Sequence, residues 1–251
     1  MRGMRGTIGM LALAAVLGGC GSAEETPTPG PSPTALVIAS ARTQPEPDLA
    51  QCKEGKMADS ELLERKQPLA VPPQFDGIAK SNLTQLAVIA MDGNTICVDT
   101  SWIESIETPK LSPDGRFLAF GWLGYEAFGY IVVDRSGKGQ VIDTGNAPLA
   151  PPSGMRFAAV DLGEAAFGAL NAFAVWDIQK TGLKQVGHFD EGLPNGDWRI
   201  DGWQGDACVK LSVLPLDRYP VDGEVDKAPR DPWFAAEKNR WKPAAGSCPK
   251  S

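Results

Sequence analysis

A repeated strand-and-turn pattern is the feature that most constrains how this chain can fold. Residues 111–120 read LSPDGRFLAF, in which a Pro-Asp-Gly turn leads into an apolar strand. Residues 152–160 read PSGMRFAAV and repeat that order 39 residues later, while YIVVD at 130–134 returns as FAVWD at 173–177 with an offset of 43. A period near 40 residues with about four strands per unit is typical of propeller blades.

The repeated units resemble two known kinds of propeller. The segment LSPDGRFLAF is similar to the Pro-Asp-Gly repeat of TolB-like propellers, and FAVWD is similar to the strand end of a WD-type blade. This resemblance implies an all-β fold, namely a propeller-like array of four-stranded blades. The array would be small or incomplete, because residues 51–251 hold fewer than five units of about 42 residues. A β-sandwich with a coincidental duplication is the alternative, and the only helix that the sequence indicates is a short one at 61–66.

The N-terminus carries a targeting signal. Two arginines precede a ten-residue apolar run, Ile8–Leu17, which is too short to span a membrane and has the length of a signal-peptide core. The run ends in Leu17-Gly18-Gly19-Cys20, which resembles the lipobox of bacterial lipoproteins. The resemblance implies that residues 1–19 are a signal peptide and that Cys20 is the lipidated N-terminus. An ordinary secretory signal with an incidental cysteine is the alternative.

Lipidation predicts where the protein resides and how its domain is held. Several acyl chains give durable membrane anchoring. Gly21 follows the cysteine in place of the aspartate that retains enterobacterial lipoproteins in the inner membrane, which favours the outer membrane, facing the periplasm. In a host with a single membrane, the protein would lie on its extracytoplasmic face. Residues 20–50 are rich in proline and poor in apolar residues, so we expect a disordered tether before a single β-rich domain at 51–251.

Four cysteines remain once Cys20 is assigned to lipid. An even number of cysteines in an exported domain favours disulfide bonds, and four cysteines allow three connectivities. We favour Cys52–Cys97 and Cys208–Cys248, because each of these bonds would tie a flanking segment to the nearest strand.

The inventory of reactive side chains argues against an enzyme. His188 is the only histidine, so neither a zinc site of several histidines nor an HExxH motif exists, and no G-x-S-x-G elbow accompanies it. Nucleotide-binding glycine motifs are also absent from the sequence. The sequence therefore predicts no catalytic residues, no metal, no cofactor and no nucleotide ligand, and His188 is expected to be a surface residue at a strand end.

Acidic residues leave one catalytic alternative open. Glycosidases use two carboxylates without a local sequence signature. Four acidic residues fall near the repeat turns, where propeller sites often lie: Glu126, Asp161, Glu164 and Asp177. With 31 acidic residues in the chain, solvated turns are the simpler interpretation.

Two further clusters could bind ligands. An acidic loop contains Asp217, Asp222, Glu224 and Asp226, whose oxygens suit calcium, although their spacing does not match an EF-hand. Four tryptophans fall in the repeat units: Trp122, Trp176, Trp198 and Trp203. Packing in the core is their simpler role, and a sugar- or peptide-binding face is the alternative.

These features predict a lipid-anchored protein of the cell envelope that acts by binding, without turnover. The net charge of −7 provides no basic footprint for nucleic acid. Turns on a rigid strand scaffold would supply the binding surface, and the expected partner is an envelope protein or a glycan. A periplasmic carboxylate-dependent hydrolase, similar to a glycosidase, is the alternative function.

Overall fold

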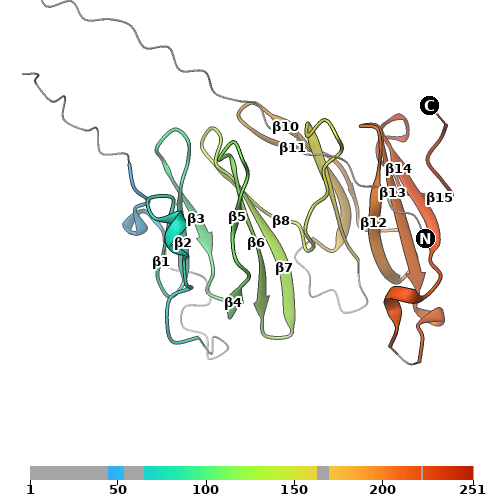
Figure 1. Cartoon of the computed structure of the whole chain (residues 1–251), viewed down its shortest axis with the longest axis horizontal. Helices are drawn as coiled ribbons and strands as arrows, with labels where there is room; N and C mark the ends of the chain where they lie inside the picture. Colours follow the sequence, from blue (N-terminus) through green and yellow to red (C-terminus); the bar gives the residue numbers. More distant parts are fainter. Residues whose placement is uncertain (1–44, 54–64, 163–169, 222, 251) are drawn as a thin grey trace, which may run out of the picture. The chain divides into compact units, whose positions relative to one another are not determined.

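The computed structural model describes residues 45–53, 65–162, 170–221 and 223–250 (Figure 1). The expected signal peptide, Cys20 and most of the expected tether lie outside these ranges, as do Glu164, Asp222 and most of the segment where a helix was expected. Within the described ranges, no helix is long and apolar enough to cross a bilayer.

The described chain is all-β, as the repeats predicted, and forms four antiparallel sheets. The first sheet contains β1 (Ala79–Ser81), β2 (Gln85–Ile89) and β3 (Thr95–Asp99). The second contains β4 (Ser105–Ile106), β5 (Lys110–Leu111), β6 (Phe117–Gly124), β7 (Ala127–Asp134) and β8 (Gln140–Asp143). The third contains β9 (Arg156–Asp161), β10 (Ala172–Gln179) and β11 (Gly182–Phe189). The fourth contains β12 (Gly196–Gln204), β13 (Cys208–Pro215), β14 (Asp231–Ala236) and β15 (Ala244–Ala245).

Short 3-10 helices complete the described elements: η1 (Leu49–Gln51), η2 (Pro73–Phe75), η3 (Leu216–Arg218), η4 (Val225–Lys227) and η5 (Glu237–Asn239). In Figure 1, each sheet is a set of neighbouring antiparallel strands within one part of the colour bar. The described strands form neither a closed barrel nor a closed propeller.

The two copies of the repeat form the same local structure. In the first copy, Gly115 adopts a φ of 72° and donates its N–H to the carbonyl oxygen of Ser112, which closes the Pro-Asp-Gly turn before β6. In the second copy, Gly154 has a φ of 66° and closes the corresponding turn before β9. The following strand of each copy returns antiparallel, so that β6–β7 and β9–β10 are equivalent hairpins.

Consecutive sheets bury apolar side chains against each other, which explains why the central strands are apolar on both faces. Alternate residues of β6 lie in a core shared with the first sheet, whereas Phe117 faces the third sheet. In β10, Ala174 and Trp176 join the core shared with the second sheet, and Phe173 and Val175 join the core shared with the fourth. The run FAVW is therefore buried on both sides.

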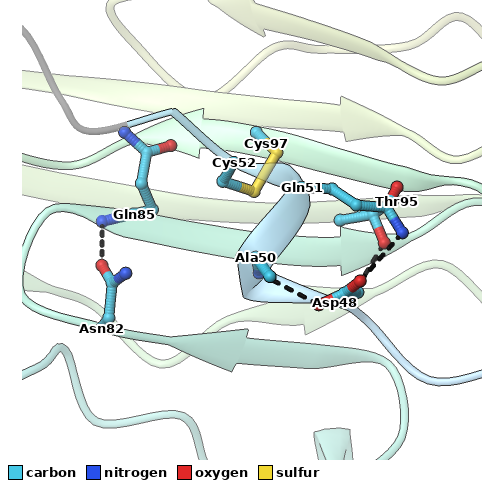
Figure 2. Close-up of a disulfide and its surroundings, with 8 residues drawn as sticks. All are labelled: Asp48, Ala50, Gln51, Cys52, Asn82, Gln85, Thr95 and Cys97. Atoms are coloured by element: carbon cyan, nitrogen blue, oxygen red, sulfur yellow. Dashed lines mark hydrogen bonds between the residues drawn. A yellow bond between two sulfur atoms is a disulfide. The ribbon is translucent and has the colours of Figure 1, made fainter.

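Disulfides attach the two terminal segments of the described chain to the first and fourth sheets, at β3 and β13. The bonds are those that the sequence favoured, Cys52–Cys97 and Cys208–Cys248. Figure 2 shows the first bond joining the end of η1 to β3, where the N–H of Asp48 also donates to the hydroxyl of Thr95 at 3.0 Å. Residues 45–50, the described end of the expected tether, thus contact the first sheet, and Pro47 among them is buried.

Candidate functional site

The single histidine lies on the surface of the third sheet. His188 is in β11, its side chain is 42% exposed, and its Nε2 lies 3.9 Å from a carboxylate oxygen of Asp190. Its Nδ1 lies 3.3 Å from the side-chain amide of Gln185. The contacts of His188 in the described chain include no serine or cysteine nucleophile, and the location agrees with a surface residue at a strand end.

Two of the acidic residues nominated for catalysis, Asp161 and Asp177, lie far apart in the described chain. Glu126 occupies the two-residue turn between β6 and β7 with a φ of 53°. Asp161 pairs with Ala172 at the start of β10, whereas Asp177 lies five residues further along that strand, a separation of roughly 17 Å. Asp177 instead faces Arg156, whose Nε lies 3.1 Å from its carboxylate oxygen. This spacing is too wide for a pair of glycosidase carboxylates.

The acidic loop engages basic side chains. Asp226 contacts Arg199 at 2.7 Å and Glu224 contacts Lys227 at 2.7 Å. Among the residues that the structure describes, no group of three or more histidine, cysteine, aspartate or glutamate side chains could hold a metal ion.

The four tryptophans pack between and within sheets. Trp122, Trp176 and Trp198 are at most 4% exposed. Trp203 stacks edge-on against Trp241 and donates its indole N–H to the carbonyl oxygen of Leu149 at 3.0 Å. These side chains therefore contribute to packing. The indole N–H groups of Trp122, Trp198 and Trp203 each donate a hydrogen bond to an oxygen atom.

A second carboxylate, Asp143, lies close to Asp161 and was missed by the sequence analysis. Asp143 ends β8 and accepts hydrogen bonds from the indole N–H of Trp122 at 2.8 Å and the backbone N–H of Gly145 at 2.9 Å. Burial raises the pKa of Asp143 in spite of these bonds. Burial also raises the pKa of Asp161, and the nearby charge of Asp143 adds to the effect.

The environment of Asp161 favours a structural role. Its Oδ2 atom is buried without a hydrogen-bond partner, and it packs so closely on Gly145 that any Cβ there would lie 2.2 Å away. Because this oxygen is covered by Gly145, a substrate has no access to it. The two carboxylates lie at the end of β8 and the end of β9, and so belong to the second and third sheets.

We predict that Asp161→Asn stabilises the protein at neutral pH. The pKa of Asp161 is higher in the folded protein than in the unfolded chain, where it is about 4. The group therefore makes its full contribution to the free energy of unfolding below about pH 4. That contribution is lost as the pH rises through the raised pKa of the folded protein. An amide carries no charge to bury, and because Asp161 is only partly buried and solvent screens its charge, the expected gain in the free energy of unfolding at pH 7 is about 1 kcal/mol or less.

Urea denaturation between pH 4 and pH 7.5 measures this effect. The advantage of Asp161→Asn should shrink toward pH 4, and Asp177→Asn, which removes a partner of Arg156, should show no such gain. A variant that is less stable than the natural protein at pH 7 would contradict the prediction.

A groove beside the β6–β7 hairpin is the candidate binding site. It consists of a cavity of about 330 Å³ and a second of about 380 Å³, which share Asn146 and Ala147. The first is lined by Glu107, Lys110, Leu123, Phe128, Tyr130 and the neighbouring glycines. The second continues along Leu149, Val160 and the β12 residues Asp197 to Ile200.

Strand alternation explains the exposed wall of this groove. Leu123 and Phe128 form a cross-strand pair and are 55% and 53% exposed, and Tyr125 at the tip of the hairpin is 62% exposed. Gly121 lies on the same face two residues before Leu123, and its lack of a side chain leaves room for the carboxylate of Glu107, which would lie 2.8 Å from a Cβ. Trp122 points to the opposite face and is buried.

Charged side chains of both signs lie next to the apolar wall, because Glu107 and Lys110 line the first cavity and Asp197 and Arg199 line the second. Burial raises the pKa of the Tyr130 hydroxyl, and the charge of Glu107 raises it further. The described residues include no ion-pair partner for Glu107, Glu126 or Lys110, in contrast to the paired acidic groups elsewhere on the surface. An exposed apolar patch beside charged groups that lack ion pairs in the described chain is thus a surface suited to contact another molecule.

No protein-family model matches the chain, and no curated protein matches it.

Proposed function

We propose that this protein is a lipid-anchored, non-enzymatic binding module of the cell envelope, and that its partner docks in the groove beside the β6–β7 hairpin. The observation that carries the proposal is the exposed Leu123–Phe128 pair next to a cavity. The strands form a scaffold to which two disulfides attach the terminal segments. Exposed apolar surface beside a concave site on a rigid scaffold is typical of binding surfaces.

The anchor is proposed from the sequence. Acylation of Cys20 after removal of residues 1–19 would hold the domain at the outer membrane, facing the periplasm, or at the outer face of a single membrane. The proline-rich segment that follows would keep the domain some distance from the lipid surface.

The scaffold is proposed to be a propeller-like array of four blades. Support comes from the second, third and fourth sheets, in each of which antiparallel strands follow one another in chain order. The bridge between Leu149 and Ala158 places a further short extended segment beside β9, before the three strands of the third sheet. The repeated turn before β6 and β9 adds to this support. The hydrolase alternative has less support, because Asp161 is covered and Asp177 is paired with Arg156.

Site-specific photo-crosslinking in living cells tests the binding function. A photoreactive amino acid at position 128 of the full-length chain is expected to capture an envelope component, whereas the same group at Met155, which is 63% exposed on the third sheet's turn, should not. Cys20→Ser, which cannot be acylated, should release the protein from the membrane fraction.

An activity screen tests the alternative function, a carboxylate-dependent hydrolase. Purified protein would be tested against peptidoglycan, glycosides, esters and peptides, with Glu126, Asp161 and Asp177 replaced singly. Reproducible turnover that one of these changes abolishes would overturn the binding module and support the hydrolase.

A further inference from the structure

The outer edge of β7 is only partly covered by β8. The register of these strands pairs Ile131 with Asp143 and ends there. The carbonyl oxygen of Tyr130 accepts the N–H of Thr144 at 2.8 Å, and beyond that point the chain turns away through Gly145. The described chain therefore provides no strand beside Ala127–Gly129 on this side of β7.

The pairing pattern shows which backbone groups face that edge. The carbonyl oxygens of Gly121 and Leu123 accept hydrogen bonds from the β4 side, from Glu107 and Glu104. The pairs Gly121–Tyr130 and Leu123–Phe128 are thus the non-hydrogen-bonded pairs of the β6–β7 ladder. It follows that the N–H and C=O of Phe128 point away from β6, toward the uncovered edge.

From this geometry we infer that the groove receives an extended polypeptide segment, which pairs with the backbone of Phe128 as a short continuation of the line of β8. The inference rests on the proposed binding function and specifies its partner as a protein strand. Main-chain hydrogen bonds to a free sheet edge give such segments affinity, and pockets for alternate side chains select their sequence.

The side chains around the edge define the chemistry of the segment. The Leu123–Phe128 pair and Tyr125 offer apolar contact, which suits apolar residues at alternate positions. Glu107 and Glu126 carry two negative charges near this pair, and Lys110, in the same cavity as Glu107, carries one positive charge. The single net negative charge suits one lysine or arginine at a neighbouring position. The partner segment is therefore alternately apolar and polar, with a basic residue beside Glu107 or Glu126.

Titration of the full-length protein in detergent micelles with a synthetic probe tests the inference. The probe is an eight-residue peptide of alternating valine and lysine, and its binding is measured by isothermal calorimetry. The same peptide with N-methyl groups on alternate residues cannot form one row of main-chain hydrogen bonds, and we expect its affinity to be at least tenfold lower.

Variants separate backbone pairing from side-chain contact. Phe128→Pro removes the outward N–H and is expected to weaken binding at least tenfold, with circular dichroism confirming that it folds. Phe128→Ser keeps the N–H and removes the ring, and Glu107→Gln removes one charge; each should weaken binding to a smaller extent. Met155→Ala is the matched control and should bind as the natural protein does.

Two results would overturn the inference. One is equal binding of the peptide and its N-methylated form. The other is binding of peptidoglycan fragments or of vesicles containing anionic phospholipid, abolished by Phe128→Ser, in the absence of peptide binding. In either case a crosslink from position 128 to an envelope component would leave the proposed binding function in place, whereas loss of that crosslink would remove both.

Discussion

Replacing Asp134 with asparagine is expected to lower the free energy of unfolding by about 3–5 kcal/mol, because it leaves the charge of Arg116 without its buried partner. Asp134 is fully buried, and the guanidinium of Arg116 donates two hydrogen bonds to its carboxylate, at 2.9 and 2.7 Å. The same guanidinium donates to the carbonyl oxygen of Gly182 on the third sheet at 3.1 Å. The ion pair therefore also joins two sheets.

The second copy of the repeat supplies a matched control. Arg156 and Asp177 form the related pair, in which the arginine lies directly opposite the aspartate, whereas Arg116 lies one residue before that position. The side chain of Asp177 is 33% exposed, and its buried Oδ1 makes no well-aligned hydrogen bond to Arg156. Solvent screens this pair, so Asp177→Asn should cost about 1 kcal/mol or less. Both variants would be compared with the natural protein by urea denaturation at pH 7.

A double variant tests whether the penalty arises from the unpaired charge. Arg116→Met with Asp134→Leu removes both charges, and it should recover much of the stability lost in Asp134→Asn. If Asp134→Asn and Asp177→Asn lowered the free energy of unfolding equally, burial of the Arg116–Asp134 pair would not be the cause of the loss in Asp134→Asn.

The sequence contains the information for this ion pair as well as for the strands. Each copy of the repeat places an arginine before the phenylalanine of one strand and an aspartate at the end of the next strand. An antiparallel hairpin of this length brings the arginine of the second copy directly opposite its aspartate, and places Arg116 one residue from that position in the first copy. The same reasoning accounts for the disulfides, since each bond connects a terminal segment to a strand that the pattern had placed.

The groove could not be predicted in this way, because it depends on where neighbouring strands stop. The exposure of Phe128 requires that β8 ends at Asp143 and that the third sheet leaves the tip of the hairpin uncovered. The proximity of Asp143 to Asp161 depends on the packing of two different sheets, which no local spacing encodes. Among the nominated acidic residues, only those within one sheet could be placed by register, and that register separates Asp161 from Asp177.

Loss of the Cys208–Cys248 disulfide is expected to cost about 4 kcal/mol. The bond closes a loop with a sequence separation of 40, for which the chain-entropy account gives a value of that size. It also holds the C-terminal segment against the fourth sheet, where the carbonyl oxygen of Pro249 accepts a hydrogen bond from the side chain of Gln204 at 2.7 Å.

The two disulfides should contribute independently, because Cys52–Cys97 lies on the first sheet and Cys208–Cys248 on the fourth. Their separate costs should then add to about 8 kcal/mol, which is comparable with the total stability of an ordinary domain, about 5–15 kcal/mol. Urea denaturation of Cys52→Ala/Cys97→Ala, Cys208→Ala/Cys248→Ala and the fourfold variant measures each contribution. We expect both double variants to fold and the fourfold variant to be largely unfolded at 37 °C. A fourfold variant as stable as either double variant would mean that the two terminal segments are coupled through the intervening sheets.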